Sequence, residues 1–142
     1  MRGEQLLKEL QTLKARYGHA KFNLVGHSHG GNTIRYVAAV APELVASVTT
    51  MGTPHQGSKV ADAVASITST TGTQGAVAAV VNGLSSVIAT LSGSAGNPQN
   101  ALASLKSLST AGAADFNRRF PQGAPTSSCG SGPAVVNGVR YY

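Results

Sequence analysis

The stretch that most constrains this chain is "KFNLVGHSHGGN", residues 21–32, in which an apolar run meets a serine flanked by glycines. The run "KFNLVG" predicts a short buried strand. Ile34, Val37 and Ala38 have helical spacing, so a helix is expected directly after the serine. "LVASVTTMG" predicts a second strand. Because strands joined by one helix pack with a right-handed crossover, the stretch predicts a parallel β-α-β unit.

The residues Gly26-His27-Ser28-His29-Gly30 fit G-x-S-x-G, the pattern of a nucleophile elbow. In such a turn the flanking glycines allow close backbone approach, and the serine hydroxyl lies at the carboxyl end of the strand. The N–H of His29 would point to where an oxyanion forms. The alternative is a serine that only caps a helix. The strand before the motif and the helix after it favour the elbow.

A nucleophilic serine needs a histidine as its base. His27 and His29 adjoin Ser28, and side chains next to the serine in a tight turn point away from it. We therefore expect neither imidazole to act as the base. His55 is the remaining histidine downstream, and we expect it to be structural.

The carboxylates downstream of Ser28 are equally few. The triad that accompanies a nucleophile elbow runs serine, then acid, then histidine along the chain. Asp62 and Asp115 both follow His55, so they do not fit this order. Glu43 precedes His55 but is expected at the surface. No credible triad is therefore expected within these residues.

The charge of the chain does not point to a nucleic-acid partner. The formal net charge is +6, but no basic run is interleaved with aromatic residues, so nucleic-acid binding is not expected. No apolar run is long enough to span a membrane. "MRGEQLLKEL" lacks the apolar core and cleavage site of a signal peptide.

Residues 63–105 contain no charged side chain. Within them an apolar stripe with helical spacing predicts an amphipathic helix. Its members are Val77, Val80, Val81, Leu84, Val87, Ile88 and Leu91. The stripe fits either a helix packed in the core or a mobile apolar cover over a pocket, and the pattern by itself favours the core helix.

Local signals predict the remaining elements. Leucines with helical spacing predict a first helix that ends at Gly18. "NPQNALASLKSL" and "TAGAADFNRRF" predict two short helices. Asn137-Gly138 between β-prone residues predicts a hairpin. The chain then stops at Tyr142, inside a predicted strand, so we expect it to be truncated.

Together these motifs resemble a known family. "NLVGHSHGGNTIRYVAAVAPELVASVTTMGTPHQGS", "NPQNALASLKSLSTAGAADFNRRFPQGAPTSSCGSG" and "VNGVRYY" resemble the secreted triacylglycerol lipases of the Pseudomonas/Burkholderia type over essentially the whole chain. The resemblance implies part of an α/β-hydrolase fold: a parallel βαβ core with a nucleophile elbow and a helical lid. It implies that residues 1–142 are the central part of one domain, truncated at both ends.

The resemblance also implies roles for individual residues. Ser28 matches the nucleophile, and the N–H of His29 matches half of the oxyanion hole. Residues 71–94 match the lid, which reverses the preference for a core helix. Cys129 matches the first half of the family's single disulfide. The triad acid and histidine, the second cysteine and the structural Ca²⁺ site are expected beyond Tyr142. No cofactor or metal is expected in this chain.

The function expected from the resemblance is hydrolysis of long-chain triacylglycerols through an acyl-enzyme on Ser28. Lipid at an oil–water interface is the expected partner, with a lipase-specific foldase chaperone, and the expected location is outside the cell. The chain by itself is expected to be inactive. Another serine carboxylesterase or acyltransferase, or a non-catalytic module that binds lipid or a partner, stays open as an alternative.

Overall fold

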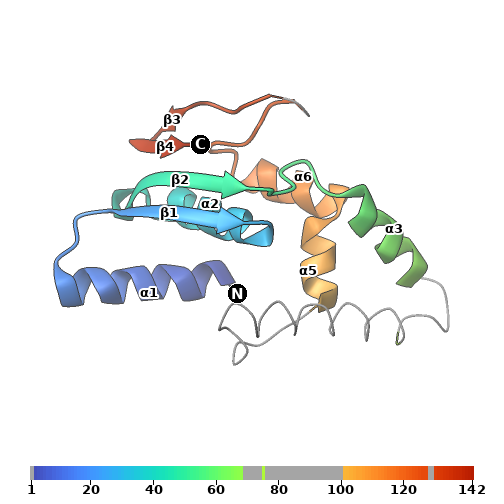
Figure 1. Ribbon diagram of the computed structural model, residues 1–142, viewed down its shortest axis with the longest axis horizontal. Coiled ribbons are helices and arrows are strands. Elements are labelled where there is room, and N and C mark those ends of the chain that lie inside the picture. Colours follow the sequence, from blue (N-terminus) through green and yellow to red (C-terminus); the bar gives the residue numbers. More distant parts are fainter. Residues whose placement is uncertain (1, 69–74, 76–100, 128–129) are drawn as a thin grey trace. The chain divides into compact units, whose positions relative to one another are not determined.

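A computed structural model of the chain describes residues 2–68, 75, 101–127 and 130–142 (Figure 1). The chain divides into two compact units, residues 1–56 with 115–142 and residues 57–114. Apart from Gly75, the predicted lid 71–94 lies outside the described residues, and so does Cys129. The predictions for the lid and for the disulfide therefore stay predictions.

The first unit is built on a four-stranded sheet with the strand order β1-β2-β4-β3. β1 (Phe22–His27) pairs in parallel with β2 (Val45–Met51), and β2 pairs in parallel with β4 (Val139–Tyr141). β3 (Val135–Val136) is antiparallel to β4. The predicted hairpin is confirmed, because Asn137 and Gly138 both have positive φ, 51° and 77°, as a type I′ turn requires.

Two helices pack with this sheet. α1 (Arg2–Tyr17) ends as predicted at Gly18, which has φ 71° and donates its N–H to the carbonyl of Lys14 at 2.8 Å. α2 (His29–Val40) connects β1 to the short 3₁₀ helix η1 (Pro42–Leu44) and then to β2. The parallel β-α-β unit predicted from the sequence is therefore confirmed.

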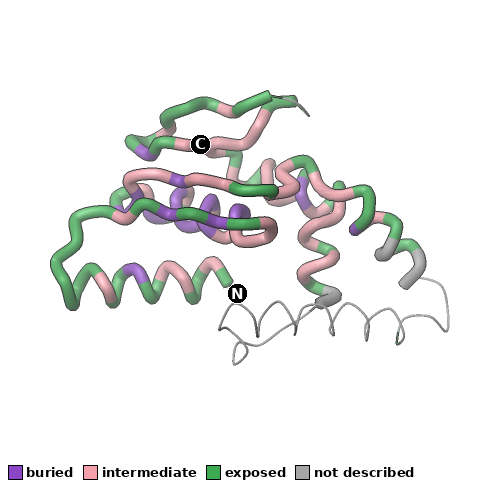
Figure 2. Tube along the Cα trace, in the orientation of Figure 1, coloured by how far each residue is buried: buried purple, intermediate pink, exposed green. Residues whose placement is uncertain are grey.

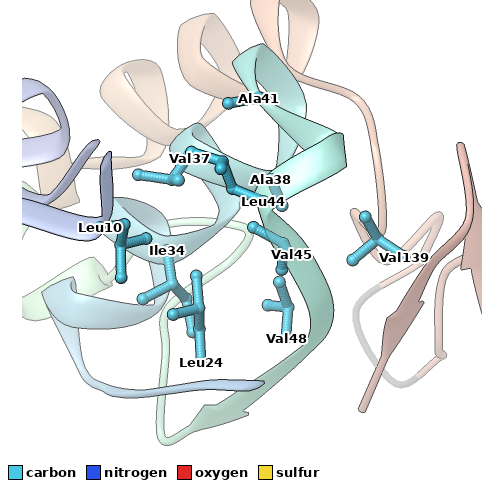
Figure 3. Packing of buried hydrophobic residues seen from close by; sticks show 10 residues of the cluster. All are labelled: Leu10, Leu24, Ile34, Val37, Ala38, Ala41, Leu44, Val45, Val48 and Val139. Atoms are coloured by element: carbon cyan, nitrogen blue, oxygen red, sulfur yellow. The ribbon is translucent and has the colours of Figure 1, made fainter. Parts of the chain in front are cut away.

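The core of this unit collects apolar side chains from α1, α2, β1, β2 and β4 (Figure 3). Val37, Val45 and Val139 are completely buried, and the buried segments gather on α2 and along β1 and β2 (Figure 2). The full set is Leu10, Leu24, Ile34, Val37, Ala38, Ala41, Leu44, Val45, Val48 and Val139.

The expectation of a buried strand at "KFNLVG" is only half right. Leu24 and Gly26 on one face of β1 are buried, but Val25 on the other face is 66% exposed. Successive side chains of a strand point to opposite faces, and in the described residues only one face of β1 is covered.

The second unit contains α3 (Lys59–Thr68), α5 (Ala101–Leu108) and the first residues of α6 (Thr110–Arg119). α5 and α6 are the two predicted short helices. Sequence reasoning missed α3, although Ser58 gave the signal: its hydroxyl accepts the N–H of Ala61 at 3.4 Å, as a helix cap does. No described helix is both long and apolar enough to cross a membrane.

The burial of the hairpin against β2 can be tested with two valines. Replacing fully buried Val139 by alanine should lower the free energy of unfolding by about 2–3 kcal/mol, because buried methyl groups are lost and a cavity remains. Val135, on the same hairpin, is 59% exposed, and Val135→Ala should cost less than about 1 kcal/mol. Equal losses in urea unfolding of the two variants would contradict this packing.

Candidate active site

Ser28 occupies the turn between β1 and α2. Its backbone has φ 53° and ψ −126°, a conformation that residues other than glycine rarely adopt. Such a conformation costs on the order of 1–3 kcal/mol and persists only where the surrounding structure holds it. Gly26 permits the turn, because a Cβ there would lie 2.6 Å from the carbonyl oxygen of Gly30. The strand–turn–helix geometry predicted from G-x-S-x-G is therefore present.

The second glycine of the motif is not the crowded one. A Cβ at Gly30 would meet nothing within 4 Å, contrary to the expectation that both flanking glycines are sterically required. The crowded position is Gly31, where a Cβ would lie 2.0 Å from Oγ1 of Thr53 and 2.8 Å from its Cβ. This requirement arises from a contact with a residue 22 positions later, which the pentapeptide cannot reveal.

The helix-cap interpretation of Ser28 is wrong. The serine stands at the N-cap position of α2, but its side chain makes no capping hydrogen bond. Its backbone is held instead: the N–H donates to the carbonyl of Met51 at 2.9 Å. Its carbonyl accepts the N–H of Gly31 at 3.1 Å and the hydroxyl of Thr53 at 2.9 Å. The hydroxyl is therefore not needed for the start of the helix.

His29 is the first residue of α2, so its N–H belongs to the helix terminus that favours negative charge. Its ring Nδ1 lies 3.3 Å from the guanidinium of Arg2. Burial, and then the positive charge of Arg2, lower the pKa of His29 below its usual value. The imidazole is therefore kept neutral near pH 7, and its ring contacts the start of α1.

His55 has both ring nitrogens engaged. Nδ1 lies 3.2 Å from the guanidinium of Arg35, and Nε2 lies 3.1 Å from the hydroxyl of Thr50. A guanidinium can only donate, so Nδ1 is the acceptor and Nε2 carries the proton. Burial and then Arg35 lower the pKa of His55. An imidazole with both nitrogens engaged is not available as a base for Ser28. This agrees with the expectation that His55 is structural.

Arg35 organises this region, and sequence reasoning missed it. It lies on α2 with only 1% of its surface exposed. Besides His55, it donates to Asn117 Oδ1 at 3.0 Å and to the carbonyls of Phe120 at 2.9 Å and Gln122 at 3.3 Å. Burial lowers its pKa to about 10. The available signal was that Arg35 is the one Asp, Glu, Lys or Arg residue in α2.

The three candidate carboxylates are occupied elsewhere or exposed. Asp62 accepts the N–H of Thr110 at 2.8 Å and its hydroxyl at 2.5 Å, and these bonds lower the pKa of Asp62. Asp115 pairs with Arg118 and Arg119 on α6, while Glu43 is exposed. No three metal-ligating side chains come together within the described ranges.

Comparison with known proteins gives the family context. A family model described as "alpha/beta hydrolase fold" matches residues 2–140. A solved structure of a Bacillus licheniformis lipase in its mature form superposes with a TM-score of 0.55 at 24% identity. That match covers 85% of this chain and 41% of the Bacillus chain, and it supports the fold alone.

The most informative relatives are bacterial. The chain is 52% identical over 142 residues to the triacylglycerol lipase of Vibrio cholerae, 47% identical over 142 residues to that of Pseudomonas fragi and 51% identical over 145 residues to that of Burkholderia plantarii. Each match covers 99% of this chain. The chain spans 46%, 48% and 40% of those proteins respectively, so it corresponds to less than half of their length. The resemblance noted in the sequence is confirmed.

Two adjacent glycines test the crowding at the turn. Gly31→Ala should lower the free energy of unfolding by about 1–3 kcal/mol, because rotation of Thr53 cannot move its Cβ away. Gly30→Ala should be neutral or stabilise by up to about 1 kcal/mol, since it adds a better helix former in open space. Chemical denaturation of both variants is the measurement, and a reversed order would contradict the assignment of the crowded position.

The lowered pKa of His55, caused first by burial and then by the charge of Arg35, predicts a pH effect. Because the pKa of His55 is lower in the folded than in the unfolded protein, the unfolded state binds more protons. The free energy of unfolding should therefore fall as the pH drops from about 6.5 through the folded pKa. His55→Asn, whose Oδ1 can still accept from Arg35, should flatten this slope. Well above the pKa of an unfolded histidine, the difference between the two proteins should not vary with pH.

Proposed function

We propose, from the premise that this chain belongs to the alpha/beta hydrolase fold family, that Ser28 is the nucleophile of a carboxylic ester hydrolase. The observation that carries the proposal is the strained, uncapped serine at the carboxyl end of β1. Its hydroxyl makes no capping hydrogen bond to α2, the helix that it precedes. Strain of this kind at a turn between strand and helix favours presentation of a reacting side chain.

The proposed reaction is acyl transfer. A general base removes the proton of the Ser28 hydroxyl as its oxygen attacks the ester carbonyl. The tetrahedral oxyanion is held by the N–H of His29 and a second donor from elsewhere in the protein. When this intermediate collapses, the base gives its proton to the leaving oxygen, the C–O bond to the alcohol breaks, and an acyl-enzyme forms on Ser28. Water then attacks the acyl-enzyme, releases the carboxylic acid and restores the serine.

The base and its carboxylate are proposed to come from parts of a longer protein that lie outside residues 1–142. His55 is committed to Arg35 and Thr50, and Asp62 is committed to Thr110. The relatives from Vibrio and Pseudomonas, of which this chain spans 46% and 48%, are long enough to supply both groups. Because residues 1–142 would then lack both groups, the chain by itself is proposed to be inactive.

The proposed substrates are long-chain triacylglycerols. Three relatives from Vibrio, Pseudomonas and Burkholderia bear the name triacylglycerol lipase. The uncharged sequence of residues 63–105 supports contact with an apolar surface, which charged side chains would oppose. A secreted location, a foldase partner and a Ca²⁺ site stay predictions of the resemblance. A soluble-ester hydrolase, an acyltransferase and a non-catalytic module are the competing functions.

Removal of the serine hydroxyl tests the proposal. In the complete protein, Ser28→Ala should reduce kcat by about 10⁶-fold on both an emulsified long-chain triglyceride and a soluble short ester, because the members of a triad act as a unit. The wild-type protein should hydrolyse the emulsion faster than the soluble ester. A preference for the soluble ester would favour a carboxylesterase.

The controls separate the nucleophile from the fold. Ser47→Ala removes another hydroxyl, one that donates to Asn23 in the same sheet, and should leave kcat unchanged. The 142-residue chain should show no turnover on either substrate. Turnover by this chain that disappears in Ser28→Ala would mean that it contains its own base.

A further inference from the structure

We propose that Thr53 is a positioning residue that orients the oxyanion-binding N–H of His29 through the carbonyl of Ser28. This inference rests on the proposed function of Ser28. It concerns a residue outside the G-x-S-x-G motif, in the loop that follows β2.

The contact itself is direct. The hydroxyl of Thr53 donates to the carbonyl oxygen of Ser28 at 2.9 Å, and the pair is partly buried. The Thr53 side chain can reach this carbonyl because position 31 carries no Cβ: one there would lie 2.0 Å from Oγ1 of Thr53. Gly31 and Thr53 therefore form one unit around the Ser28 carbonyl.

The planarity of the peptide bond connects this contact to the reaction. The carbonyl of Ser28 and the N–H of His29 belong to the same peptide group and point in opposite directions. A hydrogen bond that fixes the carbonyl therefore also fixes the direction of the N–H. Hydrogen bonding to the carbonyl oxygen further polarises the group, which makes its N–H a stronger donor.

A positioning role is favoured over simple stabilisation because the carbonyl has a second donor. Without the Thr53 hydroxyl, the Ser28 oxygen still accepts the N–H of Gly31 at 3.1 Å. It is not left as a buried unsatisfied acceptor, which would be the main cost to folding. The remaining bond comes from the same helix turn, so it does not tie the Ser28–His29 peptide to the end of β2.

The decisive variants of the complete protein are Thr53→Val, which keeps the shape and removes the donor, and Thr53→Ser, which keeps the donor. With a soluble short ester, Thr53→Val should lower kcat by about 10- to 100-fold with little change in KM, since an oxyanion donor acts in the transition state. Thr53→Ser should retain most of the wild-type kcat. Thr12→Val, which removes an exposed hydroxyl bonded to Lys8 on α1, is the matched control and should leave kcat unchanged.

Binding of a boronic acid that mimics the tetrahedral intermediate gives an independent readout. Its inhibition constant should rise in Thr53→Val by about the factor that kcat/KM falls, while binding of a ground-state product should not change. Gly31→Ala should produce the same loss, and the double variant should lose less than the product of the two single factors. Thermal unfolding of each variant shows whether it is folded at the assay temperature.

The outcomes distinguish this inference from the proposed function. If Ser28→Ala retains turnover, the nucleophile assignment fails, and the role of Thr53 fails with it. If Ser28→Ala is inactive but folded Thr53→Val keeps the wild-type kcat and boronate affinity, the inference about Thr53 alone is overturned. It is also overturned if Thr53→Ser loses as much activity as Thr53→Val.

Discussion

The hydrogen bonds that fix the peptide after β1 are the constraint on which the candidate site depends. Ser28 has a positive φ, which residues other than glycine rarely adopt, and groups at the end of β2 and in the loop after it hold this conformation. Met51 accepts the Ser28 N–H, and Thr53 donates to the Ser28 carbonyl. These groups are in reach because parallel pairing sets His27 opposite Met51. The β-α-β unit therefore both presents the serine and restrains it.

A second constraint is the buried guanidinium of Arg35. Removing an ion from water costs several kcal/mol unless its hydrogen bonds are replaced. Here four acceptors replace them: the carbonyls of Phe120 and Gln122, the side-chain amide oxygen of Asn117 and the ring of His55. The same contacts tie the segment after α6 to α2 and leave His55 with no free nitrogen. The role of this histidine is thus set by a charge that it must help to solvate.

In the proposed reaction, this chain would supply two of the groups that act on the substrate. It would contribute a nucleophile from Ser28 and one oxyanion donor from the adjacent His29. The plane of the peptide between them sets the direction of the His29 N–H. The orientation of that plane then depends on the contact between the turn and the loop that follows β2. The base and the second donor would belong to other parts of a longer protein. This agrees with the relatives from Vibrio and Pseudomonas, because this chain spans less than half of their length.

The sequence alone determined most of the elements and their order, because strands, helices and the Asn137-Gly138 turn depend on local periodicity and local backbone preference. It also indicated the serine and the family. Only the tertiary structure decided that Gly31 rather than Gly30 is the crowded glycine, that β4 pairs with β2, and that Arg35 engages His55. Each of these facts is a contact between residues far apart in the chain, and no local pattern encodes which distant side chain will approach. Periodicity specifies an element and its apolar face, while the neighbour that covers this face, or hydrogen-bonds its strained turn, is fixed only when the chain packs.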